Sequence, residues 1–251
     1  MRSSLGVSLG AANLIAVTAG RPTIRRAALT LSAHRSPEIG TSSVPGLSVT
    51  GFVDRVGDPV PLVAADGSSH HADRLVATAI EAMTREARRQ RRPDAAAVAV
   101  PAYWPESRVA ALRARVPHLI VVSDAVAALT ALQANPGLPA RGVVALCDFG
   151  ATGSSITLAD ADGFAAIGPT VRYDDFSGDL VDQSVLRRVL TDLDVDPCGT
   201  SEVTSLTDLR EQCRAAKERL SLETATGIVS AGTTIRFTRA DLESVVGGPL
   251  D

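Results

Sequence analysis

Residues 5–17, LGVSLGAANLIAV, decide the fold. They are typical of a strand, a glycine turn and a second strand. Large apolar residues alternate with Gly or Ser over residues 5–10, and residues 14–17 are all apolar. A stretch of the same design, VVALCDFGATGSSITLA, returns at residues 143–159. Successive backbone N–H groups in such a turn can form a concavity that holds anions. The pair predicts two lobes that face each other across a nucleotide; two ordinary β-hairpins are the alternative.

Helices and short apolar strands alternate around these two stretches. Residues 20–70 favour short strands or loops, and NPGLP at residues 135–139 is the best internal boundary. The spacing of apolar residues predicts the remaining helices and strands, and Pro and Gly mark where they end. We expect helices over 72–92, 105–116, 124–135, 177–193 and 207–222, a last short helix after Thr238 that Gly247, Gly248 and Pro249 stop, and wholly buried strands over 97–100 and 119–122.

Composition excludes several classes of protein. The chain has 251 residues, 45% hydrophobic and 21% charged, which is ordinary for a globular protein and allows one large domain or two small ones. No apolar run approaches the length of a membrane span, and residues 1–20 lack the pattern of a signal peptide. The net charge of −3 argues against an electrostatic nucleic-acid binder. We expect a cytoplasmic protein, and its high Ala and Arg content fits a GC-rich bacterial genome.

Cysteine and histidine give no metal or disulfide pattern. The chain has an odd number of cysteines, and they are widely spaced: Cys147, Cys198 and Cys213. We therefore expect reduced thiols. The four histidines, among them the pair His70 and His71, lack partners at ligand spacing and are expected in exposed loops.

Seven blocks, in collinear order, resemble the nucleotide-binding domain of the seventy-kilodalton heat-shock chaperones, the DnaK-like branch of the actin and sugar-kinase superfamily. The blocks are residues 5–13 LGVSLGAAN, 97–104 AVAVPAYW, 121–129 VVSDAVAAL, 148–153 DFGATG, 176–182 FSGDLVD, 213–221 CRAAKERLS and 238–243 TRADLE. The resemblance implies an α/β fold, the actin-like ATPase (ribonuclease-H-like) two-lobe fold. Lobe I would span 1–140 with a shortened peripheral subdomain at about 21–71. Lobe II would span 141–251 with a peripheral helical subdomain at about 178–238.

The same resemblance assigns the site residues. Nucleotide-binding positions fall on Gly10, Ala11, Ala12, Asn13, Asp148, Gly150, Gly178, Lys217 and Ser221. Positions that serve catalysis in the family fall on Ser8, Asp124 and Gly153.

The departures from the family pattern concentrate at these positions. Ser8 stands where the family has an Asp that serves hydrated Mg²⁺, and Ala11 and Ala12 replace two phosphate-contacting Thr hydroxyls. In the second loop, Ala151 and Thr152 replace glycines, and Gly153 replaces the Thr that supports attack by water.

Three further positions differ. Asp124 is one methylene shorter than the family Glu, Arg214 replaces a helix Glu, and the stretch with the catalytic Lys has no counterpart. Loss of one preorganised contact costs about 10²–10³ in rate. We therefore predict a pseudo-ATPase, an interaction or regulatory module that binds ATP weakly or not at all, with no cofactor expected.

Two alternatives to the pseudo-ATPase stay open. In the first, the chain is a working chaperone-like ATPase that binds ATP or ADP with magnesium. In the second, the basic run at residues 85–92 binds nucleic acid or another acidic surface, although no aromatic residue interleaves with it. In the predicted interaction module, lobe II, ending at Asp251, would lack the strands that carry the family's adenosine motif. Its sheet would then have an open edge, where we expect a protein partner or self-association.

Overall fold

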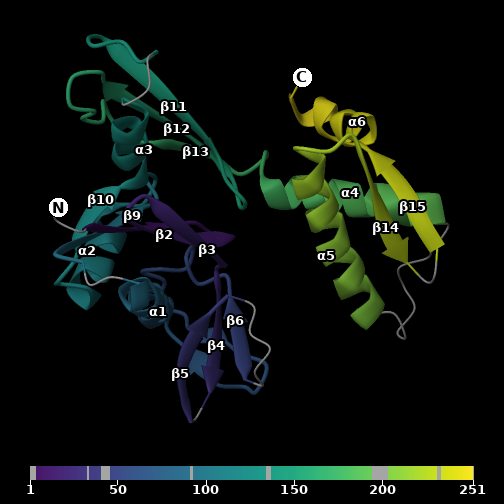
Figure 1. Cartoon of the computed structure of the whole chain (residues 1–251), viewed down its shortest axis with the longest axis horizontal. Helices are drawn as coiled ribbons and strands as arrows, with labels where there is room; N and C mark the ends of the chain where they lie inside the picture. The colour runs from purple at the N-terminus through teal and green to yellow at the C-terminus, as the bar shows by residue number, and fades with distance from the viewer. Residues whose placement is uncertain are drawn as a thin grey trace. The chain divides into compact units, whose positions relative to one another are not determined.

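The computed structural model describes residues 4–32, 34–40, 46–90, 93–133, 137–193, 203–230 and 233–250. The architecture is mixed α/β, with six helices and several sheets in the described part (Figure 1). The chain divides into two compact units. The first comprises residues 1–150 and 155–172, and the second comprises 151–154 and 173–251. The predicted division after residue 140 rests on the sequence pattern and stays a prediction.

A five-stranded sheet forms the centre of the first unit, in the order β10-β9-β1-β2-β3. Its strands are β1 (Ser4–Leu9), β2 (Asn13–Thr18), β3 (Arg21–Arg26), β9 (Ala95–Val100) and β10 (Ile120–Ser123). β1, β2 and β3 pair antiparallel, whereas β9 and β10 run parallel to β1. The predicted strand–turn–strand at residues 4–18 is therefore confirmed, and the carboxyl ends of the three parallel strands share one edge of the sheet.

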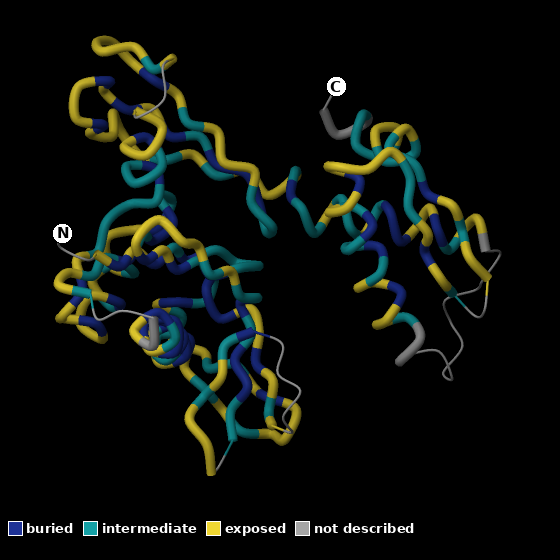
Figure 2. The backbone as a smooth tube through the Cα atoms, viewed as in Figure 1, coloured by how far each residue is buried: buried dark blue, intermediate teal, exposed yellow. Residues whose placement is uncertain are grey.

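Helix α1 (Ala72–Gln90) covers one face of this sheet. Its apolar residues recur at helical spacing, so Val76, Ile80 and Met83 are almost fully buried. They pack in one core with the inward residues of β1 and β2, such as Leu5 and Leu14. Figure 2 shows this buried core along α1 and the two strands.

The rest of the first unit consists of α2 (Glu106–Arg115), α3 (Asp124–Leu132) and small sheets. α3 follows β10 directly, and Leu129 packs with Val144, Ala159 and Phe164. These belong to the sheet β11-β12-β13 or to the turn after β12. The remaining strands are β4 (Ala28–Ser32), β5 (Arg35–Ile39), β6 (Leu47–Thr50), β7 (Leu62–Val63), β8 (Ser69–His70), β11 (Val143–Phe149), β12 (Ser154–Asp160) and β13 (Val171–Tyr173).

The second unit has its own core. Its elements are α4 (Gly178–Leu193), α5 (Val203–Leu220), β14 (Ala225–Ser230), β15 (Thr233–Thr238) and α6 (Arg239–Leu250). β14 and β15 form an antiparallel hairpin that packs on α5, and Phe237 is buried there against Cys213 and Leu220. Asp241 accepts hydrogen bonds from both the backbone N–H and the hydroxyl of Thr238, which confirms the predicted cap at the start of the last helix.

Three expectations from the sequence need correction. The strand expected to be wholly buried over 119–122 is β10, an edge strand, and Ile120 is 63% exposed. The last helix does not stop at Gly247, Gly248 and Pro249 but continues to Leu250. His70 lies in strand β8, half-buried, with Nε2 at 2.7 Å from the hydroxyl of Ser68. Cys198, Asn135 and Pro136, as well as residues 91 and 92 of the basic run, lie outside the described residues.

Candidate functional site

A pocket of about 350 Å³ in the first unit brings together Ser8, Asp124 and Asp148. The positions of these residues at the ends of their strands explain why they line one pocket. Ser8 lies near the carboxyl end of β1, and Asp124 begins α3 just after the carboxyl end of β10. Asp148 lies near the end of β11. In open α/β sheets, ligand sites typically lie at the carboxyl ends of parallel strands.

Asp124 is held by the loop that follows β9. The backbone N–H of Ala102 donates a hydrogen bond of 2.8 Å to its Oδ1. The hydroxyl of Ser123 caps the same helix by accepting from the N–H of Ala125. Burial raises the pKa of Asp124 from 3.8 to about 6; the bond from Ala102 opposes this shift, and the negative charge of Asp148 adds to it.

A second wall of the pocket comes from β11 and β12. Asp148 is exposed, whereas Ser155 and Thr157 are buried and line the pocket. The hydroxyl of Thr157 is 2.9 Å from the hydroxyl of Thr170, so it already has a hydrogen-bond partner. The polar groups of this wall are neutral apart from Asp148.

The charged donors of this pocket are the two carboxylates of Asp124 and Asp148. Mg²⁺ is bound through carboxylates, and Ser8 offers only a neutral hydroxyl. Of the two carboxylates, Asp124 gives one oxygen to Ala102 and has a raised pKa. No group of three or more His, Cys, Asp or Glu side chains arranged for a metal occurs within the described residues.

The first glycine turn is closed by its own backbone. The N–H of Gly10 donates to the carbonyl of Asn13 at 3.0 Å, and a Cβ at Gly10 would lie 2.8 Å from that oxygen. The carbonyl of Ala12 accepts from Ala27, and Asn13 Oδ1 accepts from Arg26. Ala11 is half-buried and has no polar side-chain atom. Gly10 is therefore required for the turn, and its N–H is already used.

The second glycine turn falls at the division of the chain. Gly150 belongs to the first unit, and residues 151–154 belong to the second. The carbonyl of Ala151 accepts from the N–H of Asp179, and the hydroxyl of Ser154 donates to the carbonyl of Phe176. Gly153 is buried. This turn is thus tied to the start of α4 inside the second unit.

Gly178 and Lys217, two of the nucleotide-binding positions from the resemblance, meet in the second unit. The Lys217 ammonium donates to the carbonyl of Gly178 at 2.9 Å and lies 2.6 Å from Asp182 Oδ1. Ser221 lies just after α5 and is exposed.

Arg214 joins the same network. Its Nε donates to Asp182 Oδ2 at 3.2 Å, and its other nitrogens pair with Asp179 and Glu211. Burial lowers the pKa of Arg214, but its acidic partners outweigh burial and raise it overall. Lys217 and Arg214 therefore each have an acidic partner within the second unit, since both form an ion pair with Asp182.

Sequence reasoning had not singled out Asp182 or Ala102. Asp182 follows Gly178 by four residues, so both lie on one face of a helix. That spacing indicates that a side chain close to Gly178 also lies close to Asp182. The backbone N–H of Ala102 had no signal, because only the fold brings the loop after β9 to Asp124.

No model of a known protein family matches this chain, and no match to a curated protein was found. The resemblance to the DnaK-like proteins thus rests on the seven sequence blocks. Within the described residues, no helix is both long enough and apolar enough to cross a membrane.

Proposed function

We propose that this chain is a DnaK-like domain of the actin-like, two-lobe class whose phosphate loops are degenerate. The order of the central sheet supports the proposal. Three antiparallel strands, β3, β2 and β1, are followed by two parallel strands, β9 and β10, as in a ribonuclease-H-like sheet. A glycine turn joins β11 to β12, as another joins β1 to β2.

In this proposal the domain is a pseudo-ATPase that acts as an interaction or regulatory module. The observation that carries it is the pocket of Ser8, Asp124 and Asp148. It has two carboxylates and a neutral hydroxyl, and one carboxylate is bound to a backbone N–H and has a pKa near 6. Phosphoryl transfer depends on charge neutralisation by metal and cations, and this pocket has the neutral Ser8 in place of the family's Asp and is lined by no lysine.

The second unit supports the same conclusion. Lys217 is the only lysine of the chain, and its ammonium contacts Asp182 and the carbonyl of Gly178. A nucleotide that recruited Lys217 would have to displace both partners, so binding there costs interactions already made.

Titration calorimetry with Mg²⁺ and ATP tests the proposal. We expect no saturable heat in the micromolar range and no steady release of phosphate. The variant Ser8→Asp adds a third carboxylate beside Asp124 and Asp148, so it should bind Mg²⁺ measurably. The matched variant Ser8→Asn should not, because it is nearly the same size and neutral.

Micromolar affinity for Mg-ATP in the unmodified protein, together with phosphate turnover, would contradict the pseudo-ATPase. It would favour the working chaperone-like ATPase.

The partner of such a module is a protein, and we place its contact at the outer edge of β11, near Val143. β11 is the end strand of its sheet in the described part of the chain, and Val143 on it is 62% exposed. A free strand edge with exposed apolar residues pairs readily with another strand. A second copy of the chain is the simplest such partner.

A further inference from the structure

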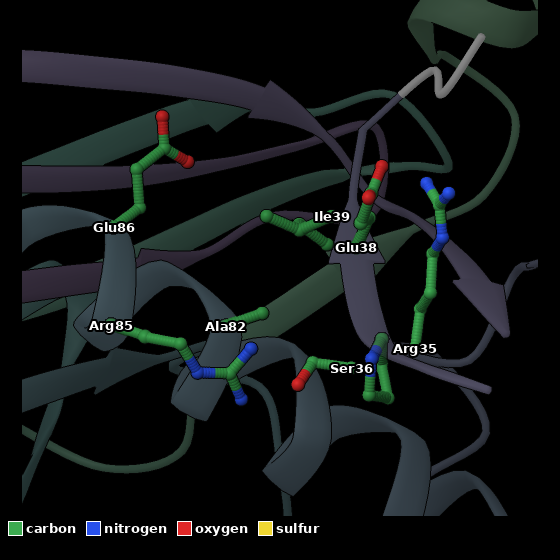
Figure 3. A pocket seen from close by; sticks show the side chains of 8 residues that line it. Arg35, Ser36, Glu38, Ile39, Ala82, Arg85 and Glu86 are labelled. Atoms are coloured by element: carbon green, nitrogen blue, oxygen red, sulfur yellow. The ribbon is translucent and has the colours of Figure 1, made fainter. Parts of the chain in front are cut away.

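A groove between helix α1 and strand β5 lies away from the pocket described above. It has a volume of about 430 Å³. Figure 3 shows the two walls: Ala82, Arg85 and Glu86 come from α1, and Arg35, Ser36, Glu38 and Ile39 come from β5. Ala82 is buried and Ile39 is half-buried, so the groove has a small apolar floor between polar rims.

The charges in this groove are unequally satisfied. Glu86 forms an ion pair with Arg25, whose side chain also lies against Gly40 at the end of β5. Arg35 and Arg85 are both exposed, and neither has an ion pair within the described residues. In Figure 3 the guanidinium of Arg85 extends from α1 toward Ser36 on the facing strand. Its five N–H donors are available for a carboxylate.

Strand β5 is an edge strand with available backbone groups. Its sheet has the order β5-β4-β6, so β4 is its one pairing partner among the strands that the structure describes. The N–H of Gly40 donates to the carbonyl of Ala28, and the next pair of residues is Leu29 with Ile39. Because hydrogen-bonded and non-hydrogen-bonded pairs alternate, the N–H and C=O of Ile39 point away from β4. Ile39 also lines the groove, so a chain that lies in the groove passes close to these two groups.

Two features limit what can pair with this edge. Pro37 has no N–H, and the register between β4 and β5 shifts near it. Both features discourage long, regular pairing with a second copy of the strand. A short segment that pairs at Ile39 and finds its other contacts in side chains avoids the problem.

A polyanion fits the groove less well than a peptide. Glu38 and Glu86 line it, and none of its described lining residues is aromatic, so a continuous row of phosphates would meet negative charge and no stacking surface. An extended peptide needs only one or two acidic side chains, which can lie beside Arg85 and Arg35. Its alternate, apolar side chains can contact Ala82 and Ile39.

We propose that the groove between α1 and β5 binds an extended protein segment with an acidic side chain. The segment hydrogen-bonds to the backbone of Ile39 and pairs its carboxylate with Arg85. This inference does not depend on the proposed loss of ATPase activity, because it concerns another part of the first unit.

Fluorescence anisotropy tests the inference with a labelled peptide, acetyl-VEVEVT-amide, and the full chain. We expect saturable binding that weakens as salt increases. The variant Arg85→Gln should weaken it about ten- to hundred-fold, the range of a lost hydrogen bond to a charged group. Arg74→Gln is the matched control, since Arg74 is an exposed arginine of α1 that does not line the groove. It should leave the affinity unchanged.

A second readout locates the peptide. The amide of Ile39 should shift in NMR spectra and gain protection from hydrogen exchange when the peptide binds. The amides of β6, at the opposite edge of the sheet, should not change. The proposal is overturned if acetyl-VKVKVT-amide binds equally well, if Arg74→Gln weakens binding as much as Arg85→Gln, if the Ile39 amide is unaffected, or if an oligonucleotide binds and the peptide does not.

Discussion

At the scale of single residues, the buried carboxylate of Asp124 lowers the free energy of unfolding at neutral pH. Burial raises its pKa from 3.8 to about 6, so between these values the folded state holds a proton that the unfolded state has lost. The free energy of unfolding therefore decreases as pH rises from about 4 to about 6. Above about pH 6 Asp124 is ionised in both states, and its effect on the free energy of unfolding no longer changes with pH. A shift of about two pKa units corresponds to about 3 kcal/mol as an order of magnitude.

The variant Asp124→Asn should therefore stabilise the protein at neutral pH, by about 1–3 kcal/mol. The amide oxygen of Asn can still accept the hydrogen bond from Ala102, while the buried charge is removed. Urea unfolding at pH 7.5 measures the gain. Repeating it at pH 3.5 should show almost no difference between the two proteins, because Asp124 is then protonated.

Asp162→Asn is the control for this experiment, since Asp162 is exposed in the first unit. It should change stability little at either pH. If Asp124→Asn destabilised the protein at pH 7.5, the charge of Asp124 would be making a favourable interaction, and the explanation by burial would be wrong.

At the scale of elements, local pattern predicted most of the first unit. The alternation in β1 and the helical spacing in α1 both depend on burial against the same core, so their sequence signals agree. β10 was predicted as a strand but placed wrongly in the sheet. Its residues are apolar because Val121 packs against the core on one face, whereas Ile120 is exposed at the edge. An apolar run alone does not separate these two environments.

The β11 edge leads to a prediction about self-association. Lysine on an edge strand blocks strand pairing, because its charge would have to enter the interface. Val143→Lys should therefore reduce self-association, measured by sedimentation velocity over a range of concentrations. Val143 is 62% exposed, so the free energy of unfolding should change by less than about 0.5 kcal/mol.

Leu222→Lys serves as the comparison for Val143→Lys. Leu222 is 90% exposed and follows α5 outside any strand, so this substitution should leave self-association unchanged. A protein that stays monomeric at every concentration would count against the β11 edge as a contact between copies.

At the scale of the whole molecule, the candidate site was predictable only in part. Motif resemblance selected Ser8, Asp124 and Asp148, and all three line one pocket. It also selected Gly178 and Lys217, which meet in the second unit. The partners that satisfy these groups, the N–H of Ala102 and the carboxylate of Asp182, are set by tertiary packing, and no short motif encodes them.

Each unit has its own core, and this predicts how the chain unfolds. Leu14 is fully buried in the core of the first unit, and Phe237 is buried in that of the second. Leu14→Ala and Phe237→Ala should each cost about 2–5 kcal/mol in their own unit. In differential scanning calorimetry we expect two transitions, with Leu14→Ala lowering the midpoint of one by about 4–20 °C and Phe237→Ala lowering that of the other by about 8–40 °C. Thr234→Ala, on the exposed part of β15, is the control and should move neither transition appreciably. A single transition that both core variants lower equally would show that the two cores unfold as one cooperative body.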